Sequence, residues 1–175
     1  ESIGTMVTNK DSMEDLYISG VAKEDNIARI TLIGKNNKIG RIYKVFKLLA
    51  DNDINVDIIV QAFGEHMAKD ISFTVKEKDL NEALEILNEN ASDFDIKEIK
   101  SWTGMSKVSI VGIGITNNPG VAAVLFEVLY ENNINMHMIS TSEIRISVLV
   151  NSNVSELALN AIHDRFIKEN SEIMV

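Results

Sequence analysis

The stretch Ile54-Asn55-Val56-Asp57-Ile58-Ile59 recurs 80 positions later as Ile134-Asn135-Met136-His137-Met138-Ile139. The same offset relates Gly40 to Gly120, and each glycine heads an apolar, helix-patterned segment that leads into its copy of the stretch. An internal repeat of this kind indicates that one structural unit is present twice. Two similar units placed side by side form a seam, and such seams are preferred sites for small ligands.

The composition narrows the class of protein. At 175 residues and 45% hydrophobic content, the chain suits two domains of about 75 residues each. The net charge of −9 without clustered Lys or Arg argues against a nucleic-acid surface. Cysteine is absent and the three histidines lie far apart, so we expect neither a disulfide nor a metal site. No apolar run approaches the roughly 20 residues of a membrane helix, which predicts a soluble, cytoplasmic protein.

The first copy has the pattern of a β-α-β-β-α-β unit. Its first helix shows apolar residues at i, i+3, i+4, i+7 and i+8 from Ile42, which is one helical face. The flanking segments are rich in β-branched residues, as strands are. We expect strands at Ala28–Gly34, Ile54–Phe63, Asp70–Lys76 and Ile96–Trp102, with helices from Gly40 to Ala50 and from Leu80 to Leu87.

The second copy lacks its last strand. Strands at Lys107–Gly112, Ile134–Thr141 and Ile144–Val150 and two helices use nearly all of the remaining chain. The strand-like run Leu16–Ala22 has no role in the first unit, so we infer that it completes the second sheet. An edge strand or a linker is the alternative for this run.

The predicted fold is therefore α+β, with two ferredoxin-like βαββαβ units, antiparallel sheets with helices on one face, and the first unit inserted in the second. The expected division is residues 1–13 as a linker, 27–102 as the first domain, and 14–26 plus 103–175 as the second.

Each copy has a loop that runs into a helix N-terminus at a glycine, at Asn36–Gly40 and Thr116–Gly120. Such termini offer unpaired N–H groups and a positive dipole end to a carboxylate or phosphate. The strand that follows brings Asp57 and Gln61 in the first copy, which predicts an amino-acid site with acceptors for the ammonium group. The alternatives are that the loops are ordinary helix starts and that Asp57 is a solvated strand residue.

Ser140-Thr141-Ser142-Glu143-Ile144-Arg145-Ile146-Ser147-Val148, with Asn135–Ile139 before it, closely resembles the "N-I-x-x-I-S-T-S-E-I-x-I-S-V" segment of aspartokinase (aspartate kinase) C-terminal regulatory regions. Asp70–Val75 and Lys107–Gly112 also resemble that family in its order, and the resemblance covers almost the whole chain. It implies tandem ACT domains without the kinase domain, to which residues 4–7 would connect.

The resemblance also implies a function. Paired ACT domains of that family bind lysine, threonine or both as feedback inhibitors of aspartate phosphorylation in amino-acid biosynthesis. A homodimer through the ACT domains is implied, as is contact with the catalytic domain, which uses ATP; the fragment itself would be no enzyme and would need no cofactor. Carried over by position, the effector contacts are Asn37, Ile39, Gly40, Arg41, Ile42, Asp57, Gln61, Asn135 and Met136, with Thr141, Ser142 and Glu143 as lesser candidates.

Two departures from the family pattern predict that the copies do not bind ligand equally. Asn37-Lys38-Ile39 replaces Asp-x-Pro in the first loop, and His137 stands where the first copy has Asp57. Two other functions are possible on sequence grounds. The chain could be an ACT-type dimerisation module without an effector, or a ferredoxin-like enzyme, although no catalytic group of residues is evident in the sequence.

Overall fold

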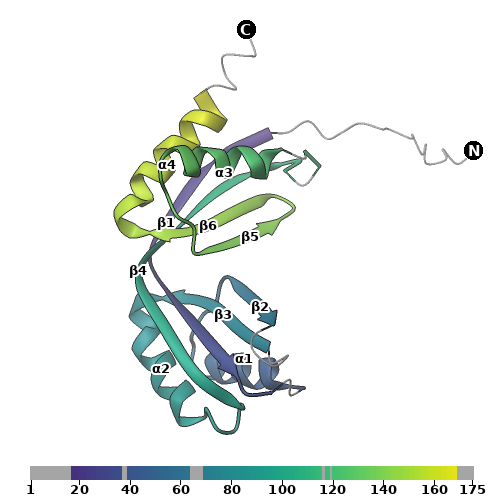
Figure 1. Ribbon diagram of the computed structural model, residues 1–175, viewed down its shortest axis with the longest axis vertical. Helices are drawn as coiled ribbons and strands as arrows, with labels where there is room; N and C mark the ends of the chain where they lie inside the picture. Colours follow the sequence, from purple (N-terminus) through teal and green to yellow (C-terminus); the bar gives the residue numbers. More distant parts are fainter. Residues whose placement is uncertain (1–16, 37–38, 64–68, 116, 119, 169–175) are drawn as a thin grey trace, which may run out of the picture.

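A computed structural model of the chain describes residues 17–36, 39–63, 69–115, 117–118 and 120–168. Two lobes form a C, joined by two long strands that run through both (Figure 1). These strands are β1 (Tyr17–Gly34) and β4 (Ile96–Ile113), each 18 residues long, and they pair antiparallel along their length. The two units therefore share one sheet.

The sheet has six strands in the order β2-β3-β1-β4-β6-β5, and every neighbouring pair is antiparallel. The outer strands are β2 (Ile59–Phe63), β3 (Lys69–Lys76), β5 (Met138–Ser142) and β6 (Arg145–Asn151). From the outer edge inward, the first lobe has the order β2-β3-β1-β4 and the second has the equivalent order β5-β6-β4-β1. β1 in one lobe therefore takes the position that β4 takes in the other. The predicted α+β fold with one unit inserted in the other is confirmed.

Helices α1 (Arg41–Asp51) and α2 (Leu80–Glu89) belong to the first lobe, and α3 (Val121–Glu131) and α4 (Ser155–His163) belong to the second. Short turns at Glu77–Asp79 and Ser152–Val154 lead into α2 and α4, and a π-helical turn at Asp164–Lys168 follows α4. Each lobe has its own core. The first is built around Ile30, Leu49, Phe73 and Leu87, and the second around Ile110, Leu125, Leu129 and Ile162.

The structure differs from the sequence expectation at the junction between the lobes. The sequence suggested separate strands on either side of Lys23–Asn26, but β1 continues through this polar segment. Asn26 adopts a left-handed backbone conformation with φ 58°, and the β1–β4 register shifts between Glu24 and Ile27. A bulge of this kind bends a strand without ending it. Tyr17–Glu24 consequently pairs with β4 in the second lobe, as the missing-strand inference requires.

The two strands that carry the repeat begin later than predicted. Residues 54–58 form a connection before β2, in which the Asp57 amide donates to Thr74 O at 3.2 Å. The equivalent His137 amide donates to Leu149 O at 2.8 Å. The repeat therefore marks the entry into each lobe's second strand.

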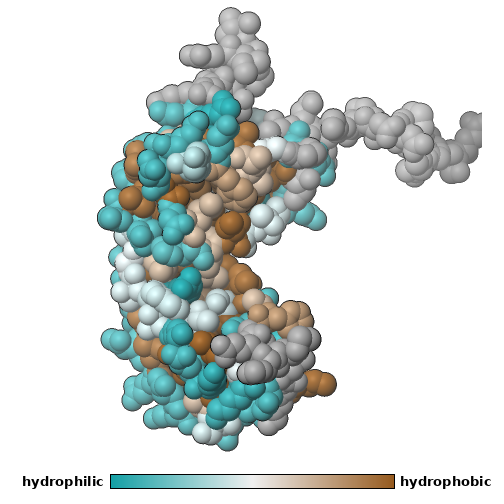
Figure 2. Space-filling model, in the orientation of Figure 1, coloured by the Kyte–Doolittle hydropathy of each residue, from teal (hydrophilic) through white to brown (hydrophobic). Residues whose placement is uncertain are grey.

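A third apolar cluster joins the lobes. It consists of Ile27, Ile58, Met105, Met138 and Leu149, all buried. The neighbours of Leu149 on β6, Val148 and Val150, point into the second core beneath the helices. Because successive side chains of a strand point to opposite faces, Leu149 points to the face of the sheet away from the helices. Hydrophobic surface follows the inner side of the C (Figure 2).

Candidate functional site

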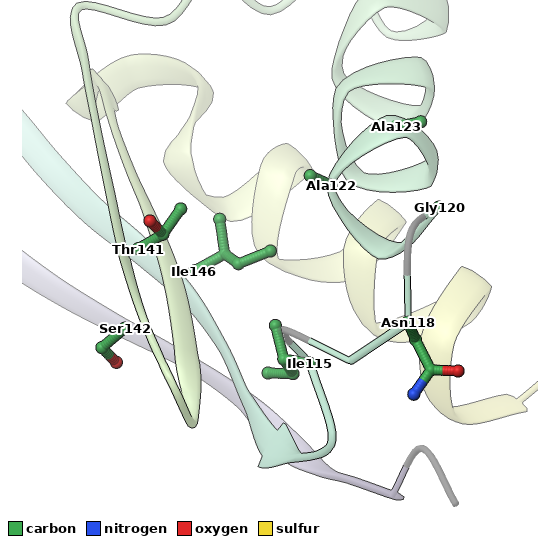
Figure 3. Close-up of a pocket in the computed structure, with 8 residues that line it drawn as sticks. All are labelled: Ile115, Asn118, Gly120, Ala122, Ala123, Thr141, Ser142 and Ile146. Carbon is green, nitrogen blue, oxygen red and sulfur yellow. The ribbon is translucent and has the colours of Figure 1, made fainter. Parts of the chain in front are cut away.

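A cavity of about 460 Å³ lies at the start of α3 in the second lobe. Figure 3 shows its lining residues, which come from the loop before α3, the first turn of α3 and the β5–β6 hairpin. They are Ile115, Asn118, Gly120, Ala122, Ala123, Thr141, Ser142 and Ile146.

The loop before α3 is shaped by Asn118. Its carbonyl accepts hydrogen bonds from the amides of Gly120 at 3.0 Å and Val121 at 3.3 Å. Its side-chain amide donates to Gly114 O at 2.8 Å. A Cβ on Gly120 would meet no heavy atom within 4 Å, so open space borders the first turn of the helix. Such a terminus carries partial positive charge and favours an anionic ligand group.

The opposite wall belongs to the β5–β6 hairpin. Thr141 and Ile146 are paired across the two strands, and they lie across from Ala122 in Figure 3. Ile115 and Ile146 supply apolar surface, whereas the Thr141 hydroxyl and the Asn118 side-chain amide supply hydrogen-bonding groups. A helix N-terminus beside this mixed lining suits a small molecule with a carboxylate and a short, partly apolar body.

The first lobe carries larger side chains at the matching positions. The 80-residue offset places Ile42 and Tyr43 where the second lobe has Ala122 and Ala123. Arg41, the counterpart of Val121, is 5% exposed and turns inward. Its Nη1 donates to Asn36 O at 3.2 Å and its Nη2 donates to Lys69 O. Bulky residues and an internally bonded guanidinium thus occupy the start of α1.

The structure brings only some of the predicted first-lobe contacts together. Ile39, fully exposed, and Gly40, with φ 86°, directly precede α1, where Arg41 and the partly exposed Ile42 begin the helix. Gln61 lies on β2 opposite Ile71, whereas Asn37 is outside the described residues.

Asp57 lies elsewhere. It follows the far end of α1, whose 11 residues span about 16 Å, so it does not face the Gly40 loop. Its carboxylate contacts Lys107 Nζ, which also lies 2.5 Å from Glu24. Burial alone would lower the pKa of Lys107, but the hydrogen bonds from Lys107 to Asp57 and Glu24 raise it above its ordinary value.

The predicted second-lobe contacts are also divided between places. Thr141 and Ser142 line the α3 cavity, and Glu143 is exposed in the β5–β6 turn. Asn135 is exposed in the approach to β5, and the adjacent Met136 lines a separate cavity of about 280 Å³ between the lobes.

Sequence reasoning missed the residues that make the α3 cavity open. The helical pattern places Ala122 on an apolar helix face but predicts no cavity beside Ala122 and Ala123. The repeat itself held the signal, because alanines stand opposite Ile42 and Tyr43 in an otherwise matching register.

Among the described residues, no group of three or more His, Cys, Asp or Glu side chains is placed to hold a metal ion. No helix in that part of the chain is both long and apolar enough to cross a membrane.

Comparison with known proteins gives one family match in each lobe. The ACT domain family matches residues 30–90 and 108–166, so the fold defines a protein with two ACT domains in tandem. Aspartokinase from Bacillus sp. (strain MGA3) is 42% identical over 164 residues, which is 93% of this chain and 40% of that protein. Aspartokinase 2 of Bacillus subtilis (strain 168) is 40% identical over the same share of each chain.

One solved structure matches most of this chain. The ligand-free regulatory subunit of aspartate kinase from Thermus thermophilus is 37% identical, with a TM-score of 0.79. The match covers 86% of this chain and 99% of that one. The chain belongs to the aspartokinase family and corresponds to its tandem ACT regulatory region. It spans about 40% of the length of the curated relatives.

Proposed function

We propose that this chain is the amino-acid-sensing region of an aspartate kinase, and that it binds lysine or threonine at the start of α3. The observation that carries the proposal is the open helix N-terminus beside Thr141, in a lobe where the matching residues of the first repeat are bulkier. The family membership supports a regulatory role, and the resemblance in sequence implies these two amino acids.

The chemistry of the lining suits an amino acid. The α-carboxylate would take the positive dipole end of α3 and those first-turn amides that do not donate to Asn118 O. The ammonium group needs acceptors, which the Thr141 hydroxyl and the Asn118 side-chain carbonyl can supply. The aliphatic part of the side chain would lie against Ile115 and Ile146.

In this proposal the ligand lies at a seam between two copies of the chain. One side of the seam is the α3 cavity with the neighbouring ends of β1 and β4, and the other side is an ACT unit of the second copy. Tyr17 and Ile113 are paired at the end of β1 and β4, and both are exposed. Ile144, whose carbonyl accepts from Gly112, is a third exposed apolar residue there. A partner unit covering these side chains would close the cavity.

Regulation would follow from differential binding. An effector that binds one arrangement of ACT units more tightly shifts the population toward it, with a coupling of about 1–3 kcal/mol. The kinase domain implied by the family resemblance, which would use ATP in the cytoplasm, would respond to that shift.

Isothermal titration with L-lysine and L-threonine tests the proposal. We expect saturable heat from at least one of them, with a dissociation constant on the order of 1 mM or tighter. Ala122→Met should fill the cavity and weaken binding about tenfold or more, which corresponds to 1.4 kcal/mol. The matched change in the first repeat, Ile42→Met, should leave the affinity unaltered.

The same exposed apolar residues favour a second function, a dimerisation module without an effector. In that case gel filtration would give a stable dimer, and neither amino acid would produce heat or raise the melting temperature. Equal loss of binding in both methionine variants would place the site elsewhere.

A further inference from the structure

The duplication places a basic residue at the same position in each lobe. Arg29 on β1 and Lys107 on β4 are equivalent, since each lies two residues before a hydroxyl that bonds across the sheet. Those hydroxyl pairs are Thr31 with Ser72 and Ser109 with Ser147, both at 2.8 Å.

Each basic side chain reaches the other lobe. Lys107 contacts the Asp57 carboxylate, and Arg29 Nη1 lies 3.5 Å from the carbonyl of His137. Asp57 and His137 are themselves equivalent, because both amides donate to matching residues of the neighbouring strand. The two contacts therefore form a reciprocal pair between the lobes.

The two basic side chains, Lys107 and Arg29, differ in whether carboxylates neutralise their charge. Lys107 has two carboxylates, from Asp57 and from its strand partner Glu24. The strand partner of Arg29 is Trp102, whose ring centroid is 3.9 Å from the guanidinium carbon. In the part of the chain that the structure describes, Arg29 has no carboxylate partner, and its buried Nε donates to no acceptor.

A cavity of about 280 Å³ lies beside this guanidinium. Its volume corresponds to roughly nine water molecules at 30 Å³ each, enough for a ligand of about six heavy atoms. Its polar lining comes from Arg29, Ser72 and His137, and its apolar lining includes Val60, Met136 and Ile139. Arg29 is partly buried, and a cation withdrawn from water without an anion is costly. A carboxylate is the anion whose two oxygens best match the N–H groups of a guanidinium.

We propose that this cavity binds a small carboxylate with a short aliphatic tail, whose carboxylate pairs with Arg29 as Asp57 pairs with Lys107. The tail lies against Val60, Met136 and Ile139. The ligand contacts both lobes, so its binding stabilises their relative position. This site is separate from the α3 cavity and does not depend on the proposed amino-acid sensing.

Trp102 is the only tryptophan of the chain and lies against Arg29, so its fluorescence reports on the site. We expect sodium butyrate to change this fluorescence saturably, with a dissociation constant on the order of 1–10 mM. Butyramide has the same shape without the charge and should leave the fluorescence unaltered. Equal responses to the two, or a response to butyrate that rises linearly without saturation, would overturn the proposal.

His137→Asp supplies the acid that the first repeat carries at Asp57. This variant gives up the 2.9 Å hydrogen bond between His137 Nε2 and Asn151 Oδ1, and it should lose the butyrate response because its own carboxylate pairs with Arg29. Asn135→Asp adds the same charge at an exposed position nearby and should keep the response. Ala122→Met should keep it as well, which separates this site from the α3 cavity. A butyrate response that persists in His137→Asp contradicts the assignment.

Discussion

Lys107 Nζ on β4 contacts the carboxylate of Asp57, which lies 50 residues earlier in the other lobe. The sequence suggested Asp57 as a ligand contact, and the structure gives it an ion pair that ties the two lobes together. Glu24 and Lys76 extend this pair into a chain of four alternating charges.

Lys107→Met should lower the free energy of unfolding by about 1–2 kcal/mol, because the side chain is largely buried and both carboxylates lose a partner. Lys47→Met removes a cation from the exposed Lys47–Asp51 pair of α1 and should change stability by about 0.5 kcal/mol or less. Urea denaturation measures both. Equal effects would show that the inter-lobe pair contributes no more than a surface pair.

Acid should weaken the same network. The hydrogen bonds from Lys107 and then Lys76 lower the pKa of Glu24 below its ordinary value of 4.5. A group with a lowered folded pKa stabilises the protein above its unfolded pKa and loses that contribution as the pH falls through the folded pKa. We expect the free energy of unfolding to fall more steeply between about pH 5 and pH 3 in the native chain than in Glu24→Gln. Parallel pH profiles would contradict this prediction.

Gly34→Ala should destabilise the first lobe by about 1–3 kcal/mol, since its Cβ would overlap the guanidinium of Arg41 and displace it from Lys69 O. Gly20→Ala, also on β1, meets nothing within 4 Å and should stay within about 0.5 kcal/mol of the native chain. Thermal melting compares the two. An unaffected Gly34→Ala variant would mean that Arg41 can move aside freely.

Leu149→Ala should cost about 2–5 kcal/mol, because Leu149 is fully buried in the cluster that joins the lobes. Leu157 on α4 is 48% exposed, and Leu157→Ala serves as the matched control with a cost of about 1 kcal/mol or less. Guanidinium denaturation followed by circular dichroism gives both values. Similar costs would show that the inter-lobe cluster is loosely packed.

The fold can be predicted from the sequence because the hydrophobic periodicity marks the helices and strands and the 80-residue repeat shows the same unit twice. The missing strand of the second unit led to Tyr17–Glu24, which pairs with β4 there. The continuity of β1 was not predictable in the same way, since a polar segment around Asn26 resembles a linker. Only the left-handed conformation of that residue within a paired strand shows that it is a bulge.

The candidate site was less predictable because its decisive contacts are distant in sequence. The glycine of the Gly40 loop predicts a ligand site there, but Arg41 is held by a carbonyl 28 residues away. The sequence predicts that Asp57 accepts from a ligand ammonium group, whereas its partner in the structure, Lys107, is 50 residues away. Neither contact has a local signature. The small residues Ala122 and Ala123 are different, because aligning the two repeats shows them opposite the larger Ile42 and Tyr43.

The sharing of β1 and β4 governs the order in which the protein can fold. Tyr17–Glu24 leaves the ribosome before either sheet exists, yet its partner on β4 is made only after the whole first unit. Pairing across that sequence distance is slow, because a long loop must close before the contact forms. We therefore expect the first unit to fold during synthesis, with Tyr17–Glu24 waiting as an open edge until β4 emerges.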